Sequence, residues 1–426
     1  MRIKFSDRRE VFIYLFAFLA IMPGYLQIAG HNITSMLTPL LLLAYMVFDG
    51  KLKLHKFSGT EAPILLFWLL RTISYVINGE YFTAIAFTVF ILFARQLVYD
   101  YVKDTVTLEN VIDIILNVSV VLGILGIIEA VTEQNLFLLL NNSGEIITRN
   151  DRRLGFIRII SFTTQTSHYA LYCCICLLLS LYLYYTRGQK KRYRNIIIIL
   201  LVNLFFTGTR IAILVMVGCY ALIVFRRGVS TFLKRSLLIL LGVIIILLFM
   251  NQTFIGQFLI MFLSQVIPGL EKLMKSGAVA SAEQSNIIGT RLQLYSWVFS
   301  SMDGHWLTGF GEKVQFAYNY IVSYMGNSWT QTKENIEVNY LSMLYHYGII
   351  GCIGESFMMI WYSIKSLKTS IIEKRVYGEM KFAAYFHYIL LFILLCWFGT
   401  MVGEERFTFY IILYLYVRYE RDKIEY

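Results

Sequence analysis

Residues 195–225, NIIIILLVNLFFTGTRIAILVMVGCYALIVF, consist of two apolar runs that meet in a short Thr-Gly-Thr-Arg turn. Strands of the alternating polar and apolar type that build outer-membrane barrels are absent from the chain. Only helices then remain to satisfy the backbone polar groups of such runs within a bilayer. The segment therefore predicts a helical hairpin in the membrane with a permanent cation, Arg210, at its tip.

The remainder of the chain has the same character. Of its 426 residues, 58% are hydrophobic and 16% aromatic, and the mean hydropathy is +0.62. Apolar stretches of about 17–25 residues, the length that a helix needs to cross the hydrocarbon, recur along the chain. We expect an all-α fold, a single polytopic helical membrane domain over residues 1–426 with about twelve transmembrane helices. The expected spans are 11–29, 34–48, 62–78, 81–99, 109–131, 161–186, 195–208, 210–225, 236–254, 337–364, 382–402 and 407–419.

The distribution of Lys and Arg predicts the orientation. With both termini in the cytoplasm, the inner loops receive most of the Lys and Arg residues, which accounts for the net charge of +11 without a nucleic-acid partner. The cytoplasmic membrane is then the expected location. Two outer loops are long: 132–160, and 255–336 between the ninth and tenth spans, in which Ile255–Pro268 is apolar enough for an interfacial helix. The six cysteines lie in apolar runs and indicate neither a disulfide framework nor a metal site.

Arginines in the outer segments are exceptions to this preference of Lys and Arg for the cytoplasmic side. Arg153, Arg210 and Arg291 each lie near glycine, in RLGF, TGTR and GTRLQLYSW. Long loops carry charge freely, and this is the alternative explanation for the two in loops. Because the arginine fork matches phosphate oxygens, we predict that these three residues bind a lipid-linked diphosphate. Arg71 lies inside an expected span, where it would snorkel, pair with a carboxylate such as Glu129, or face a cavity.

Four motifs follow one another along residues 150–365. An arginine-glycine loop precedes SFTTQTSHYALY, the TGTR hairpin comes next, GTRLQLYSWVFSSMDGHWLTGFGE opens the large loop, and ENIEVNYLSMLYHYGIIGCIGE re-enters the membrane. In order and membrane placement, this series resembles the O-antigen polymerase and ligase superfamily of bacterial polysaccharide assembly.

The resemblance implies a membrane glycosyltransferase. Polymerases of the superfamily transfer a glycan from undecaprenyl diphosphate to the terminal sugar of another lipid-linked repeat unit at the outer face of the membrane, to make O-antigen, capsule or exopolysaccharide. The lipid-linked oligosaccharides and the bilayer are the implied partners, with a chain-length regulator and a flippase of the same pathway as further candidates. No cofactor is implied.

Two other activities compete with polymerisation. Ligases of the superfamily carry a histidine beside the asparagine before the re-entering helix, whereas this chain has Glu337-Val338-Asn339, which favours a polymerase. A flippase or transporter of lipid-linked oligosaccharides is the third hypothesis. Transporters tend to show internal repeats and ionisable sites at the midplane. This chain instead concentrates its polar residues in the long outer loops.

The transfer requires a positive field on the leaving diphosphate and a base for the attacking hydroxyl. The outer loops contain no Asp-x-Asp, so a divalent metal is not indicated, and we expect a metal-independent enzyme in which Arg210, Arg291 and Arg153 supply the field. Glu337 is the candidate base. Glu334 could replace it, and a carboxylate stabilised by the helix dipole is the alternative role for Glu337.

Three more residues are candidates for contacts with substrate: His168, His305 and Trp306. An ordinary loop histidine is the alternative for His305. The glycines at 348, 351 and 354 recur at helical spacing, which predicts close packing of helices.

Overall fold

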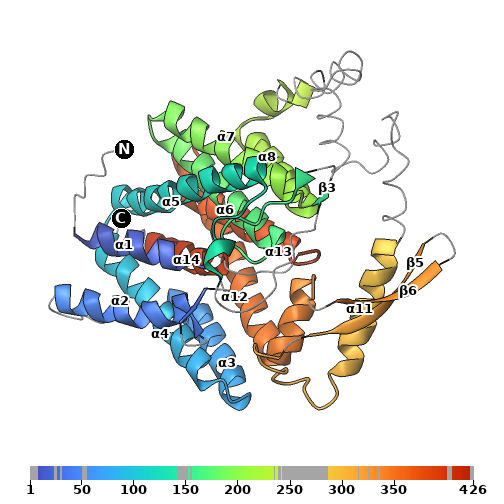
Figure 1. Cartoon of the computed structure of the whole chain (residues 1–426). Coiled ribbons are helices and arrows are strands. Elements are labelled where there is room, and N and C mark those ends of the chain that lie inside the picture. The colour runs from blue at the N-terminus through green and yellow to red at the C-terminus, as the bar shows by residue number, and fades with distance from the viewer. Residues whose placement is uncertain are drawn as a thin grey trace.

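The computed structural model describes residues 8–23, 26–28, 31–49, 55–141, 152–153, 156–234, 236–237, 241, 286–314, 316–324, 327–333, 336–400 and 405–422. Its labelled helices (Figure 1) are α1 (Arg9–Leu19), α2 (Ile33–Asp49), α3 (Ala62–Ile77), α4 (Tyr81–Tyr101), α5 (Thr105–Thr132), α6 (Thr166–Thr186), α7 (Lys190–Thr207), α8 (Arg210–Arg227), α11 (Asn286–Ser301), α12 (Asn339–Tyr377), α13 (Phe382–Cys396) and α14 (Glu405–Asp422). Short 3-10 turns cover Gly59–Glu61 and Leu138–Leu140.

The strands form small antiparallel hairpins that connect the helices. They pair β1 (Gln27–Ile28) with β2 (His31–Asn32), β3 (Arg152–Arg153) with β4 (Phe156–Ile157), and β5 (Tyr318–Tyr324) with β6 (Asn327–Lys333). The helices carry the fold, and the hairpins belong to the connections between them.

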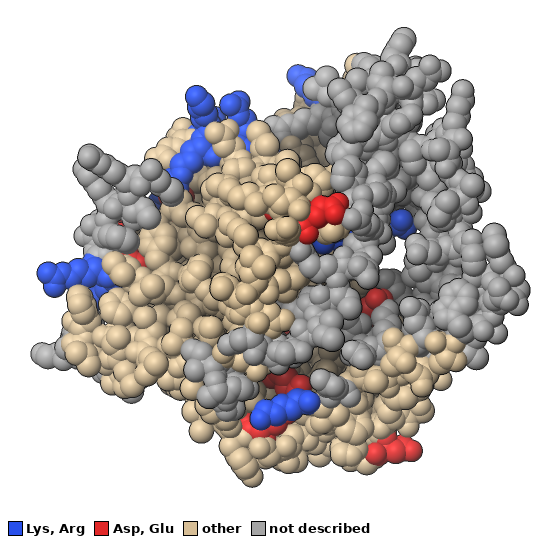
Figure 2. Space-filling view, in the orientation of Figure 1, with Lys and Arg blue, Asp and Glu red and all other residues tan. Residues whose placement is uncertain are grey.

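This architecture confirms an all-α polytopic membrane protein. Helices occupy most of the described part of the predicted spans. Five of the described segments are long and apolar enough to cross a membrane: 59–77, 81–101, 105–132, 166–186 and 339–377. The described surface in Figure 2 is mostly uncharged, as expected of a surface in contact with lipid. The number of spans and their orientation stay predictions. Most of the range 236–254, and all of Ile255–Pro268, lie outside the described residues.

Helix α6 lies at the centre of the bundle. Every residue from His168 to Leu183 is buried, so the helix has no face turned to lipid or water. A helix that is apolar on all sides is stable only when other helices surround it. Helices α5, α7, α8, α13 and α14 pack around it, and their ends are thereby fixed relative to the two ends of α6.

Helix α12 is broken at Gly348. This residue has a φ of 62° and a ψ of −167°, which is outside the helical region. It lies about 13 Å along the helix from its start. The break frees backbone N–H groups that the preceding turn would otherwise bond. The N–H of Ile349 donates to the carbonyl of Trp306 at 2.9 Å, and the N–H of Ile350 donates to the carbonyl of Leu307 at 3.2 Å.

The segment 306–311 fills this break from both sides. The N–H groups of Phe310 and Gly311 donate to the carbonyls of Tyr345 and His346, both at 2.9 Å. A Cβ on Gly309 would lie only 2.5 Å from the backbone of His346, so glycine is required for this close approach. The HWLTGFGE segment, residues 305–312, is therefore part of the helix break.

The same segment is bound to the end of α3. The carbonyl of Thr308 accepts the Ser74 hydroxyl at 2.8 Å and the Asn78 amide at 3.1 Å. Tyr75 donates to Glu312 at 3.0 Å. Since Ser74 and Thr308 are more than 200 residues apart in sequence, these bonds connect the amino-terminal third to the large loop.

Arg71, also on α3, lies at the level of the break. Its side chain is 2% exposed, its Nη1 is 3.6 Å from a carboxylate oxygen of Glu355, and its guanidinium carbon is 3.1 Å from the centre of the Tyr347 ring. Glu129, the carboxylate suggested by the sequence, instead accepts backbone N–H groups elsewhere. A buried charge in a membrane helix is stable only when paired, and here the partners come from both sides of the Gly348 break.

Part of the range 255–336 forms a second small core. Leu294 and Val298 of α11 pack with Phe316, Tyr318 of β5 and Tyr345 of α12. Figure 1 shows α11, β5 and β6 beside the first half of α12. The glycines of α12 were expected to allow close packing of helices, and this is correct only in part. Gly354 packs closely on Leu70 of α3, whereas Gly348 breaks the helix.

We predict that Gly348→Ala destabilises the protein. The new Cβ would lie 2.4 Å from the backbone of Leu307, and the alanine would have to adopt the positive φ of this position. The clash and the backbone strain together should lower the free energy of unfolding by about 2 kcal/mol or more. The measurement is the apparent melting temperature in detergent, which should fall.

Gly218→Ala in α8 is the matched control, because a Cβ there meets nothing within 4 Å and alanine favours helix. Equal melting temperatures for Gly348→Ala and wild type would contradict the role assigned to the break.

Candidate functional site

The Thr-Gly-Thr-Arg turn joins α7 directly to α8. Helix α7 ends at Thr207, Gly208 takes the left-handed conformation (φ 60°), and α8 begins at Arg210. Only glycine adopts this φ without strain, which is why the turn can be so short. Arg210 therefore lies at the short turn between two helices, as the sequence predicts. The two helices do not pack against each other as a hairpin would: α7 packs mainly on α6 and α5, and α8 packs mainly on α13.

Arg210 begins its helix at an unfavourable place for a cation. The first turn of a helix carries a partial positive charge, which favours anions. The Nε of Arg210 is buried without a hydrogen-bond partner among the described residues, and Thr209 supplies no side-chain cap. Since the positive end of α8 and the guanidinium coincide, this end of the helix is suited to bind an anion.

A second arginine, Arg158, lies at the same turn. Its Nε donates to the carbonyl of Thr207 at 2.8 Å, and its Nη2 is 3.4 Å from the hydroxyl of Thr209, the residue before Arg210. The neighbouring N–H of Ile159 donates to the carbonyl of Phe206 at 3.2 Å. Two guanidinium groups are thus attached to one turn of the chain.

A buried carboxylate holds the segment 158–161, which follows β4 and carries Arg158. Glu129 of α5 accepts the N–H groups of Ile160 and Ser161, at 3.2 and 2.8 Å, and the amide of Asn135 at 3.0 Å. Ser161 has a φ of 50°, an uncommon conformation for a residue with a side chain. Such strain persists where surrounding bonds enforce it, and it often occurs near functional sites.

His168 belongs to the same end of the bundle. It is buried in the first turn of α6, with its Nδ1 3.3 Å from the hydroxyl of Thr164. The hydroxyl of Thr209 donates to the carbonyl of Thr166 at 3.4 Å, so the starts of α6 and α8 lie together. The structure therefore brings His168 near the turn that carries Arg210.

For the other two predicted arginines, Arg153 and Arg291, the structure describes the backbone position only. Arg153 pairs with Phe156 in the β3–β4 hairpin, which leads within a few residues to Arg158. Arg291 lies in α11. Their side chains lie outside the described part of the structure. The convergence of these side chains with Arg210 on one diphosphate therefore stays a prediction.

Glu337 lies at the same end of the bundle as Arg210. Helices α8 and α13 are antiparallel, because Cys219 contacts Tyr388 while Arg227 contacts Tyr385. The start of α8 and the end of α13 are therefore at one end.

The end of α13 is in turn bonded to the segment that carries Glu337. The N–H of Asn339 lies 3.1 Å from the carbonyl of Trp397 and 3.2 Å from that of Thr400. Glu337, two residues before Asn339, is half-buried. Its alternative Glu334 lies outside the described residues.

His305 and Trp306 belong to the segment at the break in α12. His305 is exposed, with its ring stacked on Phe310 at 4.2 Å between centroids, and Trp306 is 38% exposed. His346, in contrast, is bonded to the carbonyl of Gly311. The first pair presents rings to the surface, which suits contact with a sugar.

Arg158 was not among the site residues predicted from the sequence. In the sequence it lies a short distance before SFTTQTSHYALY, the polar segment that enters a helix. Within the described residues, His, Cys, Asp and Glu do not gather in groups of three that could hold a metal ion.

A comparison with known families matches part of the chain. Residues 195–354 match a family model described as O-antigen ligase. The matched region contains the TGTR turn, α11, and α12 as far as Gly354, and it confirms the resemblance to the O-antigen polymerase and ligase superfamily. A search of curated proteins found no significant match.

We predict that Glu129→Gln loosens the segment 158–161 beside the turn. A charged acceptor contributes about 2 kcal/mol to its hydrogen bonds, so amide hydrogen exchange at Ile160 and Ser161 should accelerate about 30-fold. Glu109→Gln, on the same helix but bonded to Arg187, is the control and should leave these amides unchanged. Unaltered exchange in Glu129→Gln would show that the carboxylate does not hold this segment.

Proposed function

We propose that this protein polymerises undecaprenyl-diphosphate-linked oligosaccharide repeat units into a surface polysaccharide, an O-antigen, capsule or exopolysaccharide. Members of the matched superfamily are membrane glycosyltransferase-like enzymes. The observation that carries the proposal is the turn at the start of α8, where Arg210 and Arg158 meet the positive end of a helix. This is the chemistry that a diphosphate requires.

The surface of α8 suits the lipid part of the substrate. Leu214 and Val217 follow Arg210 at helical spacing and are 53% and 59% exposed. A diphosphate at Arg210 would thus place its polyprenyl chain along an apolar stripe that begins one turn deeper. The headgroup and the hydrocarbon are both accommodated by one helix.

The reaction follows from these positions. A hydroxyl of the acceptor sugar forms a bond with the anomeric carbon of the donor, and the bond from that carbon to the diphosphate oxygen breaks. Undecaprenyl diphosphate leaves with the electron pair, and Arg210 and Arg158 stabilise its growing charge. Glu337 takes the proton of the hydroxyl. Arg153 and Arg291 would add to the positive field, and His168, His305 and Trp306 would contact the glycan.

Ligation is the second candidate, favoured by the description of the matching family model. A ligase would use the same diphosphate chemistry with a different acceptor. The absence of histidine from Glu337-Val338-Asn339 favours polymerisation. A chain-length regulator and a flippase are proposed partners, and the outer face of the cytoplasmic membrane is the proposed location of the reaction.

We predict that Arg210→Ala and Arg210→Lys abolish long polysaccharide chains. Loss of a donor to transition-state charge lowers rates about 100-fold or more, and lysine cannot reproduce the arginine fork. Lipid-linked glycans would be extracted from a deletion strain complemented with each variant. Arg194→Ala, an exposed arginine at the far end of α7, is the control.

The glycans distinguish the activities. Single repeat units at the outer face would support polymerisation, and long lipid-linked chains without their final acceptor would indicate a ligase. Single units retained inside would indicate a flippase. Wild-type chain lengths in both Arg210 variants would refute the proposed diphosphate site.

We predict that Glu337→Gln lowers the rate of transfer 100-fold or more while the substrate still binds, because an amide cannot accept the proton. A carboxylate that only stabilises the helix would leave the rate near wild type. The measurement is turnover of a lipid-linked repeat unit by purified protein, with Glu334→Gln as the comparison. Full activity in Glu337→Gln would remove this residue from the mechanism.

A further inference from the structure

A pocket of about 640 Å³ lies between α5 and the beginning of α7. It is at the end of the bundle opposite Arg210, because α7 begins here and ends at the turn before α8. Lys190, Lys191 and Arg192 form its rim, and Val120, Ile196 and Ile199 form its apolar floor. The pocket is distinct from the candidate diphosphate site.

The charge of the rim is positive. None of the described residues that line the pocket carries a carboxylate. Asp113, the carboxylate bonded to Arg192, also accepts from Arg187 and Tyr193: the three distances are 3.1 Å, 2.8 Å and 3.0 Å. Lys190 and Lys191 are exposed and form no ion pair within the described residues.

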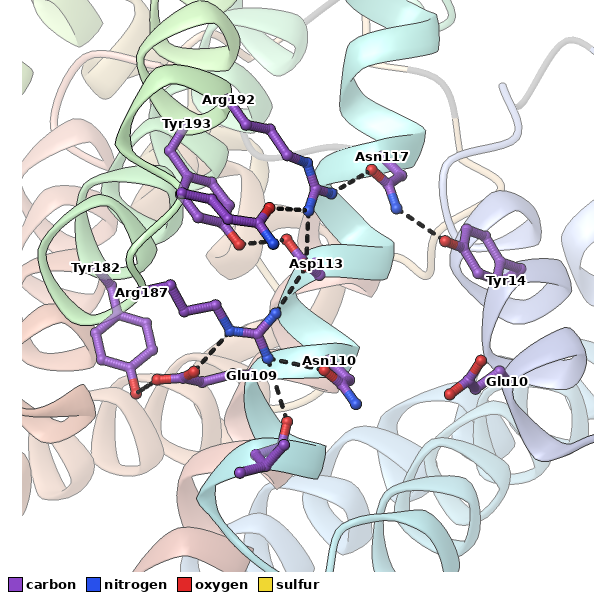
Figure 3. Close-up of polar contacts among 12 residues, drawn as sticks. Glu10, Tyr14, Glu109, Asn110, Asp113, Asn117, Tyr182, Arg187, Arg192 and Tyr193 are labelled. Carbon is purple, nitrogen blue, oxygen red and sulfur yellow. Dashed lines mark hydrogen bonds and ion pairs between the residues drawn. The ribbon is translucent and has the colours of Figure 1, made fainter. Parts of the chain in front are cut away.

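The rim is built on a fixed frame. Figure 3 shows Arg187 and Arg192 bonded along one face of α5, where Glu109, Asp113 and Asn117 follow at intervals of one helical turn. Asn117 accepts from Arg192 and donates to Tyr14 of α1. The network holds the α6–α7 turn against α5, so Lys190 and Lys191 stand at a defined edge of the pocket.

The floor continues as an apolar surface toward the membrane interior. Val121 and Ile124 on α5 are 53% and 48% exposed, and Ile198 and Leu201 on α7 are 52% and 48% exposed. A ligand that fills the pocket would therefore have an anionic part at the lysines and hydrocarbon along these residues. A soluble anion would leave this apolar surface unused.

We propose that this pocket binds the headgroup of an anionic phospholipid from the leaflet at this end of the bundle. Basic pockets between membrane helices bind such headgroups through charge and hydrogen bonds. The phosphate lies against Lys190, Lys191 and Arg192, and the acyl chains follow α5 and α7. The proposal is independent of the reaction at the opposite end.

The experiment measures lipid binding by the purified full-length chain with native mass spectrometry. Phosphatidylglycerol and phosphatidylcholine with identical acyl chains are the probes. Wild type should prefer phosphatidylglycerol. Lys190→Gln/Lys191→Gln should weaken its tightest binding about 30-fold, roughly fivefold for each lysine. Lys365→Gln/Lys368→Gln, which removes two lysines from the same end of the bundle, should leave the preference intact.

A second pair of variants keeps both lysines. A Cβ on Gly188 meets nothing within 4 Å, so Gly188→Asp adds a carboxylate to the lining without a clash, and Gly188→Asn is its uncharged equivalent. Only the aspartate should weaken phosphatidylglycerol binding. Equal binding of the two lipids by wild type, or equal effects of the aspartate and asparagine, would overturn the proposal. Displacement of the lipid by equimolar glycerol phosphate would overturn it in favour of a soluble anion.

Discussion

Backbone N–H and carbonyl groups inside a membrane need partners within the protein, and the break in α12 is the place where this constraint organises the molecule. Gly348 interrupts the helical ladder, and segment 306–311 takes over the missing bonds. Because Thr308 of the same segment is bound by Ser74 and Asn78, the break also joins α3 to the large loop. Segment 306–311 of the loop is therefore held by bonds to two helices, α3 and α12.

The sequence predicted the helices well, because each apolar run must become a helix in lipid. It predicted the TGTR turn between two helices for the same reason, with Arg210 at the turn, but it did not show that α7 and α8 pack on other helices. The break at Gly348 was missed, since a glycine at helical spacing is typical of close packing and the partner segment lies about forty residues earlier in the chain. The partner of Arg71 was missed as well, because periodicity does not show which helices are neighbours.

The sequence predicted some residues of the candidate site and missed others. Composition and motif order pointed to arginines at the outer end, and the structure places Arg210, His168 and Glu337 at one end of the bundle. Arg158 was not selected, because its importance depends on contacts across the fold: its bonds to the α7–α8 turn and the anchor at Glu129. The proposed phospholipid pocket lies at the other end, so anions of two kinds would be bound at opposite surfaces.

The central claim is that the start of α8 binds the diphosphate of a lipid-linked glycan that is then polymerised. The most direct measurement is a reconstituted reaction in which purified protein receives one defined undecaprenyl-diphosphate repeat unit and no other glycan acceptor. We predict a ladder of longer lipid-linked chains, with one free undecaprenyl diphosphate released for each added unit. A protein that binds the substrate but forms no longer chain until a different acceptor is supplied would contradict polymerisation.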